Sequence, residues 1–226
     1  SVKNYGSHMF GVHEALAILE SNLDTTGNIN FLLTAPWHSL RLVCFRGKSA
    51  ANKPTFELDD KLIVKRKGTC RDFETSTLKP LPPIPNKFII AIQNSFISKK
   101  VGYVVKDKSL RSDISKDEDI INLYIAIIKK MKKISKNRGQ EFVVGFIKAN
   151  GIDYRSFNNE LIISRLLASE INLVDMSLLN EQGISPDKYV IDPKFERHSS
   201  AIANYERASI LTSYLQKLRL LNIEKN

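Results

Sequence analysis

The residues with the clearest chemical potential lie close to the C-terminal end of the chain. Glu196 and His198 are separated by one residue, Asp192 precedes them, and a helix is predicted from Ala201 to Leu220. A carboxylate that holds an imidazole in one tautomer lets the ring accept the proton of a nucleophilic hydroxyl. We therefore predict His198 as a general base that is oriented by Glu196 or Asp192. The alternative is a histidine that caps the helix or lies on the surface, beside two solvated acids.

A loop near the N-terminal end, residues 4–11, is the second candidate. Gly6, Met9 and Gly11 lie in this loop, which leads into a predicted helix from Val12 to Leu23. Backbone N–H groups of such a loop can stabilise an oxyanion, whatever the side chain of Met9; the alternative is an ordinary turn before a helix. Ser7 is a candidate nucleophile, but a nucleophile turn follows a strand and only five residues precede Gly6. Ser7 otherwise is a plain loop serine.

The third candidate is the segment from Pro36 to Arg41, which follows a predicted buried strand, Ile29–Thr34. His38 lies in this segment, and a neutral imidazole donates one hydrogen bond, so His38 is a candidate oxyanion donor. Trp37 and Arg41 flank it, and they either shape a substrate pocket or pack over it. No histidine, cysteine or acid has the spacing of metal ligands, and we expect neither a metal nor an organic cofactor.

Strands and helices alternate along much of the chain. Further helices are predicted from a cap at Ser112 or Asp113 to Gly139 and over Leu161–Ser169, and further strands over Phe142–Ile147 and Ile171–Met176. This order predicts an α/β fold of three layers, in which helices cover both faces of a mostly parallel sheet. The active site of such a sheet lies at the carboxyl ends of its strands. We expect residues 4–11, 36–41 and 192–198 to form loops at that edge.

We expect one domain over residues 1–226, with an insertion at about residues 44–110. Within this insertion the sequence predicts a short hairpin, Thr55–Phe–Glu–Leu and Lys61–Leu–Ile–Val around an Asp59-Asp60 turn. A proline-rich connection follows at residues 78–85, and residues 88–105 are apolar without a clear period. Cys44 and Cys70 could form a disulfide in an oxidising compartment or remain free thiols.

The chain is basic, with a net charge of +10 at pH 7 and a hydrophobic content of 42%. A positive charge suits an anionic partner, such as a polysaccharide, a phospholipid surface or a nucleic acid. Much of this charge lies in residues 129–138, which also read as the solvated face and C-terminal end of a helix. No recognition motif accompanies the charge, and we therefore do not expect nucleic acid as a partner. No apolar run reaches the length of a membrane span.

These segments together resemble the SGNH, or GDSL-like, hydrolases. The segment Asn4-Tyr-Gly-Ser-His-Met-Phe-Gly11 with the following helix is similar to the second block of that family, and Ile29–Arg41 to the third. Glu196-Arg-His198-Ser-Ser before the terminal helix is similar to the last block. The resemblance is one of pattern through nearly the whole chain. It implies a flavodoxin-like sheet, a catalytic role for His198, and an oxyanion site near Gly6 and Met9.

The chain also departs from the family. The Gly-Asp-Ser block, which supplies the nucleophile of the family, is absent from this sequence, so we expect it and the first strand to precede Ser1. Met9 stands where the second block has a glycine, His38 where the third block has an asparagine, and Glu196 where the last block has an aspartate. The longer Glu196 side chain changes the reach of the acid to the imidazole.

The resemblance implies a serine esterase or acyltransferase. Its substrate would carry an ester, with O-acetyl groups of a carbohydrate as one expected class. The protein would work in a bacterial cell envelope or as a secreted protein. The second hypothesis is a non-catalytic module of the same fold, which binds an anionic glycan or a protein partner through its basic surface. The sequence leaves the oligomeric state, the acyl group and the acceptor open.

Overall fold

The structure is a computed structural model. It describes residues 3–6, 10–21, 27–44, 52–72, 117–148, 159–182, 186–192 and 196–220, and the side chains of residue 192 and residues 196–198 are outside this description. The predictions for Ser7, Met9, the helix cap at Ser112 or Asp113, and residues 78–85 and 88–105 therefore lie outside the described residues.

A parallel sheet lies at the centre of the molecule and confirms the predicted α/β character. Its strands are β1 (Ile29–Thr34), β4 (Glu141–Phe146) and β5 (Asn172–Asp175), in the order β1-β4-β5. Both pairs are parallel, and the register places Thr34 beside Phe146 and Phe146 beside Asp175. The carboxyl ends of the three strands therefore form one row, which we call the carboxyl edge.

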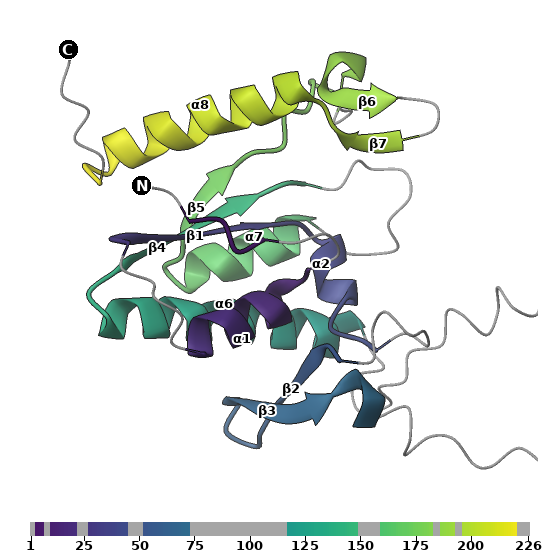
Figure 1. Ribbon diagram of the computed structural model, residues 1–226, viewed down its shortest axis with the longest axis vertical. Helices are drawn as coiled ribbons and strands as arrows, with labels where there is room; N and C mark the ends of the chain where they lie inside the picture. Colours follow the sequence, from purple (N-terminus) through teal and green to yellow (C-terminus); the bar gives the residue numbers. More distant parts are fainter. Residues whose placement is uncertain are drawn as a thin grey trace, which may run out of the picture.

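Helices cover both faces of this sheet (Figure 1). One face carries α1 (Val12–Glu20), α6 (Asp117–Asn137) and α7 (Asn159–Ala168), and the other carries α8 (Ala201–Lys217). The α8 side is held by a smaller cluster in which Leu215 packs with Val143, Val174 and Met176. β4 is buried along most of its length, as its run of apolar residues predicts, whereas Phe31 and Leu33 of β1 remain 39% and 44% exposed.

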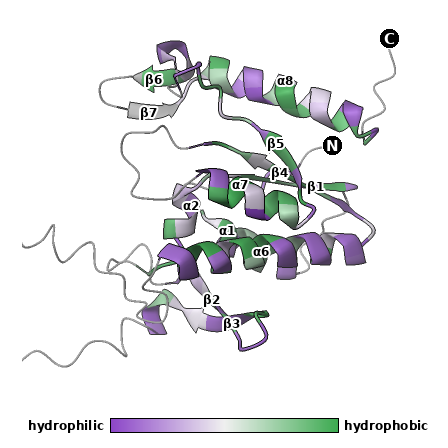
Figure 2. Cartoon of the chain, turned by 180° about the vertical axis from the view of Figure 1, so that it is seen from behind, coloured by the Kyte–Doolittle hydropathy of each residue, from purple (hydrophilic) through white to green (hydrophobic). Residues whose placement is uncertain are grey.

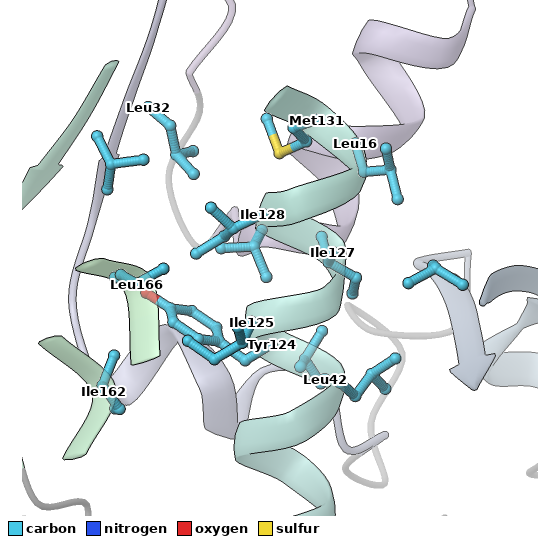
Figure 3. Packing of buried hydrophobic residues seen from close by; sticks show 14 of the residues in the cluster. Leu16, Leu32, Leu42, Tyr124, Ile125, Ile127, Ile128, Met131, Ile162 and Leu166 are labelled. Atoms are coloured by element: carbon cyan, nitrogen blue, oxygen red, sulfur yellow. The ribbon is translucent and has the colours of Figure 1, made fainter. Parts of the chain in front are cut away.

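The main core is built around α6 (Figure 3). Its isoleucines that recur at helical spacing face the core, and Tyr124, Ile127 and Ile128 are fully inaccessible. In Figure 2 hydrophobic positions alternate with hydrophilic ones along α6, as expected of a helix with one buried face. Three acidic residues begin the helix, and Gly139, at φ +69°, follows its end in the conformation that favours glycine.

Among the described helices, none combines the length and the apolar character that a membrane span requires.

Two antiparallel hairpins complete the described fold. The first, β2 (Pro54–Leu58) with β3 (Val64–Thr69), lies within the predicted insertion. The prediction that its second strand covers residues 61–64 was wrong, because Asp59 builds a longer turn. Its carboxylate accepts hydrogen bonds from the N–H groups of Lys61 at 3.0 Å and Ile63 at 2.8 Å.

The second hairpin pairs β6 (Val190–Asp192) with β7 (Glu196–Ser199), after a 3-10 helix, η2 (Asp187–Tyr189). Ser200 then caps α8: its side chain accepts a hydrogen bond from the N–H of Ala203 and donates one to the carbonyl of Lys188. The prediction that residues 192–198 form a loop was therefore wrong. The chain instead turns back on itself, and this return fixes the direction in which α8 begins.

Candidate functional site

His38 follows β1 at the carboxyl edge, and it lies in a short helix rather than in the predicted loop. This helix, α2 (Trp37–Leu40), begins after Pro36, whose φ of −56° and ψ of −39° are already helical. Proline is favoured at the start of a helix because its fixed φ suits it. The same residue that ends β1 therefore begins α2, and the turn of helix carries His38 back over the end of the strand.

A short polar chain connects His38 with the core. The Nδ1 atom of His38 lies 3.2 Å from the hydroxyl oxygen of Thr34, which in turn lies 2.8 Å from the hydroxyl of the fully buried Tyr124. Burial and the neighbouring Arg41 lower the pKa of His38 to about 4, so its ring is neutral at pH 7. If Tyr124 donates to Thr34 and Thr34 donates to Nδ1, the remaining proton of the ring is on Nε2. This arrangement would make His38 a hydrogen-bond donor toward a substrate.

Arg41 joins two of the predicted segments. Its guanidinium donates a hydrogen bond to the carbonyl of Phe10, which precedes the first helix. Gly11 lies at the same junction, where a Cβ atom would come within 2.8 Å of the His13 ring and 3.1 Å of the Cβ of Arg41. Glycine is therefore needed here for close approach. The segments around residues 10 and 41 are packed directly against one another.

The N–H groups of the two described glycines of the 4–11 segment are both engaged within the chain. The N–H of Gly6 donates to the side-chain oxygen of Asn4 at 2.9 Å, and the N–H of Gly11 donates to the carboxylate of Glu14 at 2.7 Å. An oxyanion at Gly6 would therefore have to displace the Asn4 side chain, which is exposed. The Gly11 bond is buried, and it fixes the start of α1.

The sequence did not predict a buried charged cluster around Glu14. The Oε2 atom of Glu14 lies 2.9 Å from Nε2 of His13, and its Oε1 atom lies 3.1 Å from the Nζ atom of Lys53. Burial by itself raises the pKa of Glu14, but His13, the Gly11 N–H and Lys53 outweigh it and lower this pKa to about 2.

The contacts in this cluster are electrostatic rather than well-directed hydrogen bonds. Both ring nitrogens of His13, Oε1 of Glu14 and the hydroxyl of Thr55 are buried without a hydrogen bond of suitable angle among the described residues. Attraction between charges depends on distance more than on angle, so the short separations still stabilise the ionised Glu14. The motif that could have indicated this cluster is the capping glutamate at the third helical position after Gly11.

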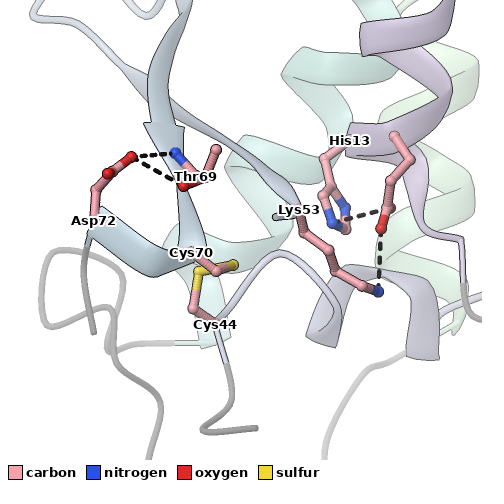
Figure 4. Close-up of a disulfide and its surroundings, with 7 residues drawn as sticks. His13, Cys44, Lys53, Thr69, Cys70 and Asp72 are labelled. Atoms are coloured by element: carbon pink, nitrogen blue, oxygen red, sulfur yellow. Dashed lines mark hydrogen bonds and ion pairs between the residues drawn. A yellow bond between two sulfur atoms is a disulfide. The ribbon is translucent and has the colours of Figure 1, made fainter. Parts of the chain in front are cut away.

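A disulfide holds Lys53 in this cluster. Cys44 and Cys70 are bonded to each other, which decides between the two alternatives left open by the sequence. The bond connects the end of the α2 segment to the end of β3, and the N–H of Cys70 donates to the carbonyl of Lys53 at 3.0 Å. Figure 4 shows the disulfide and the Lys53 side chain, which reaches from the neighbouring segment toward His13 and Glu14. The covalent link therefore fixes the strand that brings Lys53 to Glu14.

The segment with Asp192, Glu196 and His198 is placed by its backbone. Asp192 and Glu196 are cross-strand partners of the β6–β7 hairpin, and His198 lies on β7 beside Ser199. Because their side chains are outside the description, the roles predicted for these three residues stay predictions.

Arg207, on α8, anchors this hairpin, and no sequence pattern indicated this role. Its Nη1 atom donates to the hydroxyl of Ser199 at 2.6 Å, and its Nε atom donates to the carbonyl of Met176 at 2.9 Å. Only 8% of Arg207 is exposed. Since Met176 directly follows β5, this guanidinium ties the strand of His198 to the carboxyl edge of the sheet.

The basic segment of α6 makes internal contacts. Lys130 lies 2.6 Å from the carboxylate of Glu20 and donates to the carbonyl of Val64. Lys132 donates to the carbonyl of Glu170 at 2.7 Å. These contacts favour a structural role for part of the basic segment. They do not test its partners.

The 4–11 segment precedes α1, β1 leads into α2 with His38, and the hairpin of His198 leads into α8. The described residues contain no group of three or more histidine, cysteine or acidic side chains that could hold a metal ion. Comparison with protein-family models, with curated proteins and with solved structures finds no match for this chain.

Proposed function

We propose that this chain carries the base and the oxyanion donor of a serine-type esterase or acyltransferase of the SGNH kind. The observation that supports this most strongly is the convergence on the carboxyl edge. His38 follows β1 there, and Arg207 ties the strand of His198 to Met176, directly after β5. Ligands of parallel α/β sheets bind at this edge, which supports a role in substrate binding for both histidine-bearing segments.

The spacing of the strands suits a substrate that lies between the two histidine-bearing segments. β1 and β5 are separated by β4, and neighbouring strands are about 4.8 Å apart, so the ends of β1 and β5 are about 10 Å apart. An acyl group over the end of β4 would have one segment on each side. The β1 side would supply hydrogen bonds to the oxyanion, and the β5 side would supply the base.

Each residue then has a defined role. His198 takes the proton from the attacking hydroxyl and returns it to the leaving group, and Glu196 or Asp192 holds the imidazole. The neutral His38 donates a hydrogen bond from Nε2 to the oxyanion, a group of the kind whose loss typically costs about 100-fold or more in turnover. The resemblance assigns the nucleophile to a serine of a Gly-Asp-Ser block, which this sequence does not contain, and Ser7 is the candidate within the chain.

The test uses the intact gene product and a fluorophosphonate probe, which labels activated serines. We expect one label by intact mass and hydrolysis of p-nitrophenyl acetate. We also expect His198→Gln to abolish both, and His38→Leu to lower kcat far more than it raises KM. Tyr205→Ala on α8, where the side chain is 75% exposed, is the control and should behave as the wild type.

Two results would contradict the proposal. If the wild-type protein takes up no label and hydrolyses no ester, the catalytic assignment is wrong, and the non-catalytic binding module is the better description. If labelling is retained in His198→Gln, the base lies elsewhere. Peptide mapping of the labelled residue would distinguish Ser7 from any other serine.

A further inference from the structure

A pocket with a volume of about 590 Å³ opens at the carboxyl ends of β4 and β5. It extends from the first turn of α7 to α8, which lie on opposite faces of the sheet (Figure 1). Its volume is in the range of small-molecule sites. The described residues that line it are Lys148, Asn159, Glu160, Asp175, Ser177, Leu178, Leu179, Asn180, Glu181, Gln182 and Ile210.

A fixed polar network forms one wall of this pocket. Lys148 Nζ lies 2.8 Å from Oδ2 of Asp175, and the backbone N–H of Ser177 donates to Oδ1 of Asp175 at 3.0 Å. The Ser177 hydroxyl donates to the same carboxylate and accepts from the N–H of Lys148 at 2.9 Å. The wall is therefore held in one arrangement before any ligand enters.

This network is suited to binding rather than to catalysis. Ser177 is only 6% exposed, so its hydroxyl is poorly accessible for attack on a bound ligand. Asp175 raises the pKa of Lys148, so this lysine stays an ammonium group and does not act as a base. What remains accessible is half of the Asp175 side chain, at 54% exposure, and part of Lys148.

The charge of the lining distinguishes between ligands. Among the described lining residues, one lysine and three carboxylates, Glu160, Asp175 and Glu181, give a net charge of −2 on a chain of net charge +10. A lining of this sign repels anions and attracts cations. The pocket is therefore unsuited to the anionic partners that the overall charge of the chain favours.

The uncharged lining residues indicate the rest of the ligand. Three primary amides lie in the described lining, on Asn159, Asn180 and Gln182, and the side-chain oxygen of Asn180 accepts a hydrogen bond from the N–H of Gln182 at 3.0 Å. The carboxylates of the lining can accept hydrogen bonds from hydroxyl groups. Ile210 and the two leucines add apolar surface for carbon-bound hydrogens. Leu178 is held at φ +53°, an uncommon conformation for a leucine.

We propose that this pocket binds a hydroxyl-rich ligand without negative charge, such as one unit of a neutral or amino-substituted saccharide. This deepens the proposed function, on which it rests for its role: the pocket would hold the alcohol part of the ester. Binding itself requires no turnover, so it can be measured separately from hydrolysis.

The experiment compares three sugars of one scaffold that differ in charge: methyl glucoside, glucosamine and glucuronate. Each sugar is titrated into isotope-labelled protein that has not been treated with fluorophosphonate, and the amide NMR signals of residues 177–182 are followed. We expect saturable shifts with methyl glucoside and glucosamine. The affinity for glucuronate should be at least about tenfold weaker than for glucosamine, because its carboxylate is repelled by the negative lining.

Glu181→Gln and Asp175→Asn should each weaken glucosamine more than methyl glucoside. Glu181 is exposed, so its substitution leaves the fold intact if Asp175→Asn does not fold. Asp187→Asn, an exposed carboxylate on η2 outside the pocket, is the matched control and should change neither affinity.

Two outcomes overturn the pocket proposal: no sugar shifts these signals, or glucuronate binds as tightly as glucosamine. The outcomes also separate the two proposals. Sugar binding without fluorophosphonate labelling would remove the esterase and keep the pocket. Ester hydrolysis without any sugar-induced shift would remove the pocket and keep the esterase.

Discussion

Glu14 should make the stability of this protein depend on acidity in a defined pH window. In the folded chain its pKa is about 2, against an ordinary value of 4.5. Because the folded-state pKa is the lower one, the stabilisation is complete above pH 4.5 and is lost as the pH falls toward 2. A difference of this size corresponds to about 3 kcal/mol, which we reduce to about 2 kcal/mol because Lys53 is partly exposed to solvent.

Glu14→Gln measures this contribution directly. Glutamine can still accept the hydrogen bond of Gly11, but it carries no charge to pair with the ammonium group of Lys53. We expect the variant to lose about 2 kcal/mol of unfolding free energy at pH 7. Urea unfolding between pH 7 and pH 2 should show the two proteins converging below pH 4.5.

A second buried group provides an internal control for this experiment. The pKa of His38 is about 4 against an ordinary 6.5, so the unfolded chain binds a proton first and stability falls between pH 6.5 and 4. His38→Leu should remove the pH dependence of the unfolding free energy between pH 6.5 and 4. It should leave unchanged the dependence below pH 4.5 that Glu14 causes. If Glu14→Gln keeps the acid dependence of the wild type below pH 4.5, the charge cluster does not stabilise the fold and the reasoning is wrong.

Three further predictions concern other contacts. Reduction of the disulfide, or Cys44→Ala with Cys70→Ala, should cost about 3 kcal/mol by closing-loop entropy, and dithiothreitol should destabilise the wild type in urea but not the double variant. Thr34→Val should cost about 1–3 kcal/mol because the buried Tyr124 hydroxyl loses its partner, whereas Thr34→Ser should be close to wild type; equal urea midpoints would contradict the chain of hydrogen bonds. Arg207→Met should speed amide hydrogen exchange across β7 relative to the β2–β3 hairpin, and unchanged exchange would mean that the guanidinium does not hold the strand.

The regular elements could be predicted because their signals are local. Ile29–Thr34 is a short apolar run before a proline, and it forms β1 over the same residues. The face of α6 could be predicted from spacing, since its isoleucines recur with the helical period and are buried. The parallel order followed from the alternation of such elements.

The contacts that hold the candidate site could not be predicted, because they join residues far apart in the sequence. Lys53 reaches Glu14, and Arg207 reaches Met176, through folding of the intervening chain. Predictions from the hydrophobic pattern were also wrong where a single polar residue or proline determines the local backbone. Asp59 accepts two backbone N–H groups and lengthens a turn, and Pro36 begins a helix where a loop was expected.

The disulfide has a consequence for how this protein is prepared. Such bonds persist in oxidising compartments and are kept reduced in a cytosol. In protein made in a reducing host, Cys44 and Cys70 would stay reduced, and Lys53, which precedes β2 and pairs with Glu14, would no longer be held by the covalent link. Samples of one sequence from two expression hosts would then differ in the surroundings of α1. A difference in activity between the two samples would then reflect whether the disulfide had formed in each host.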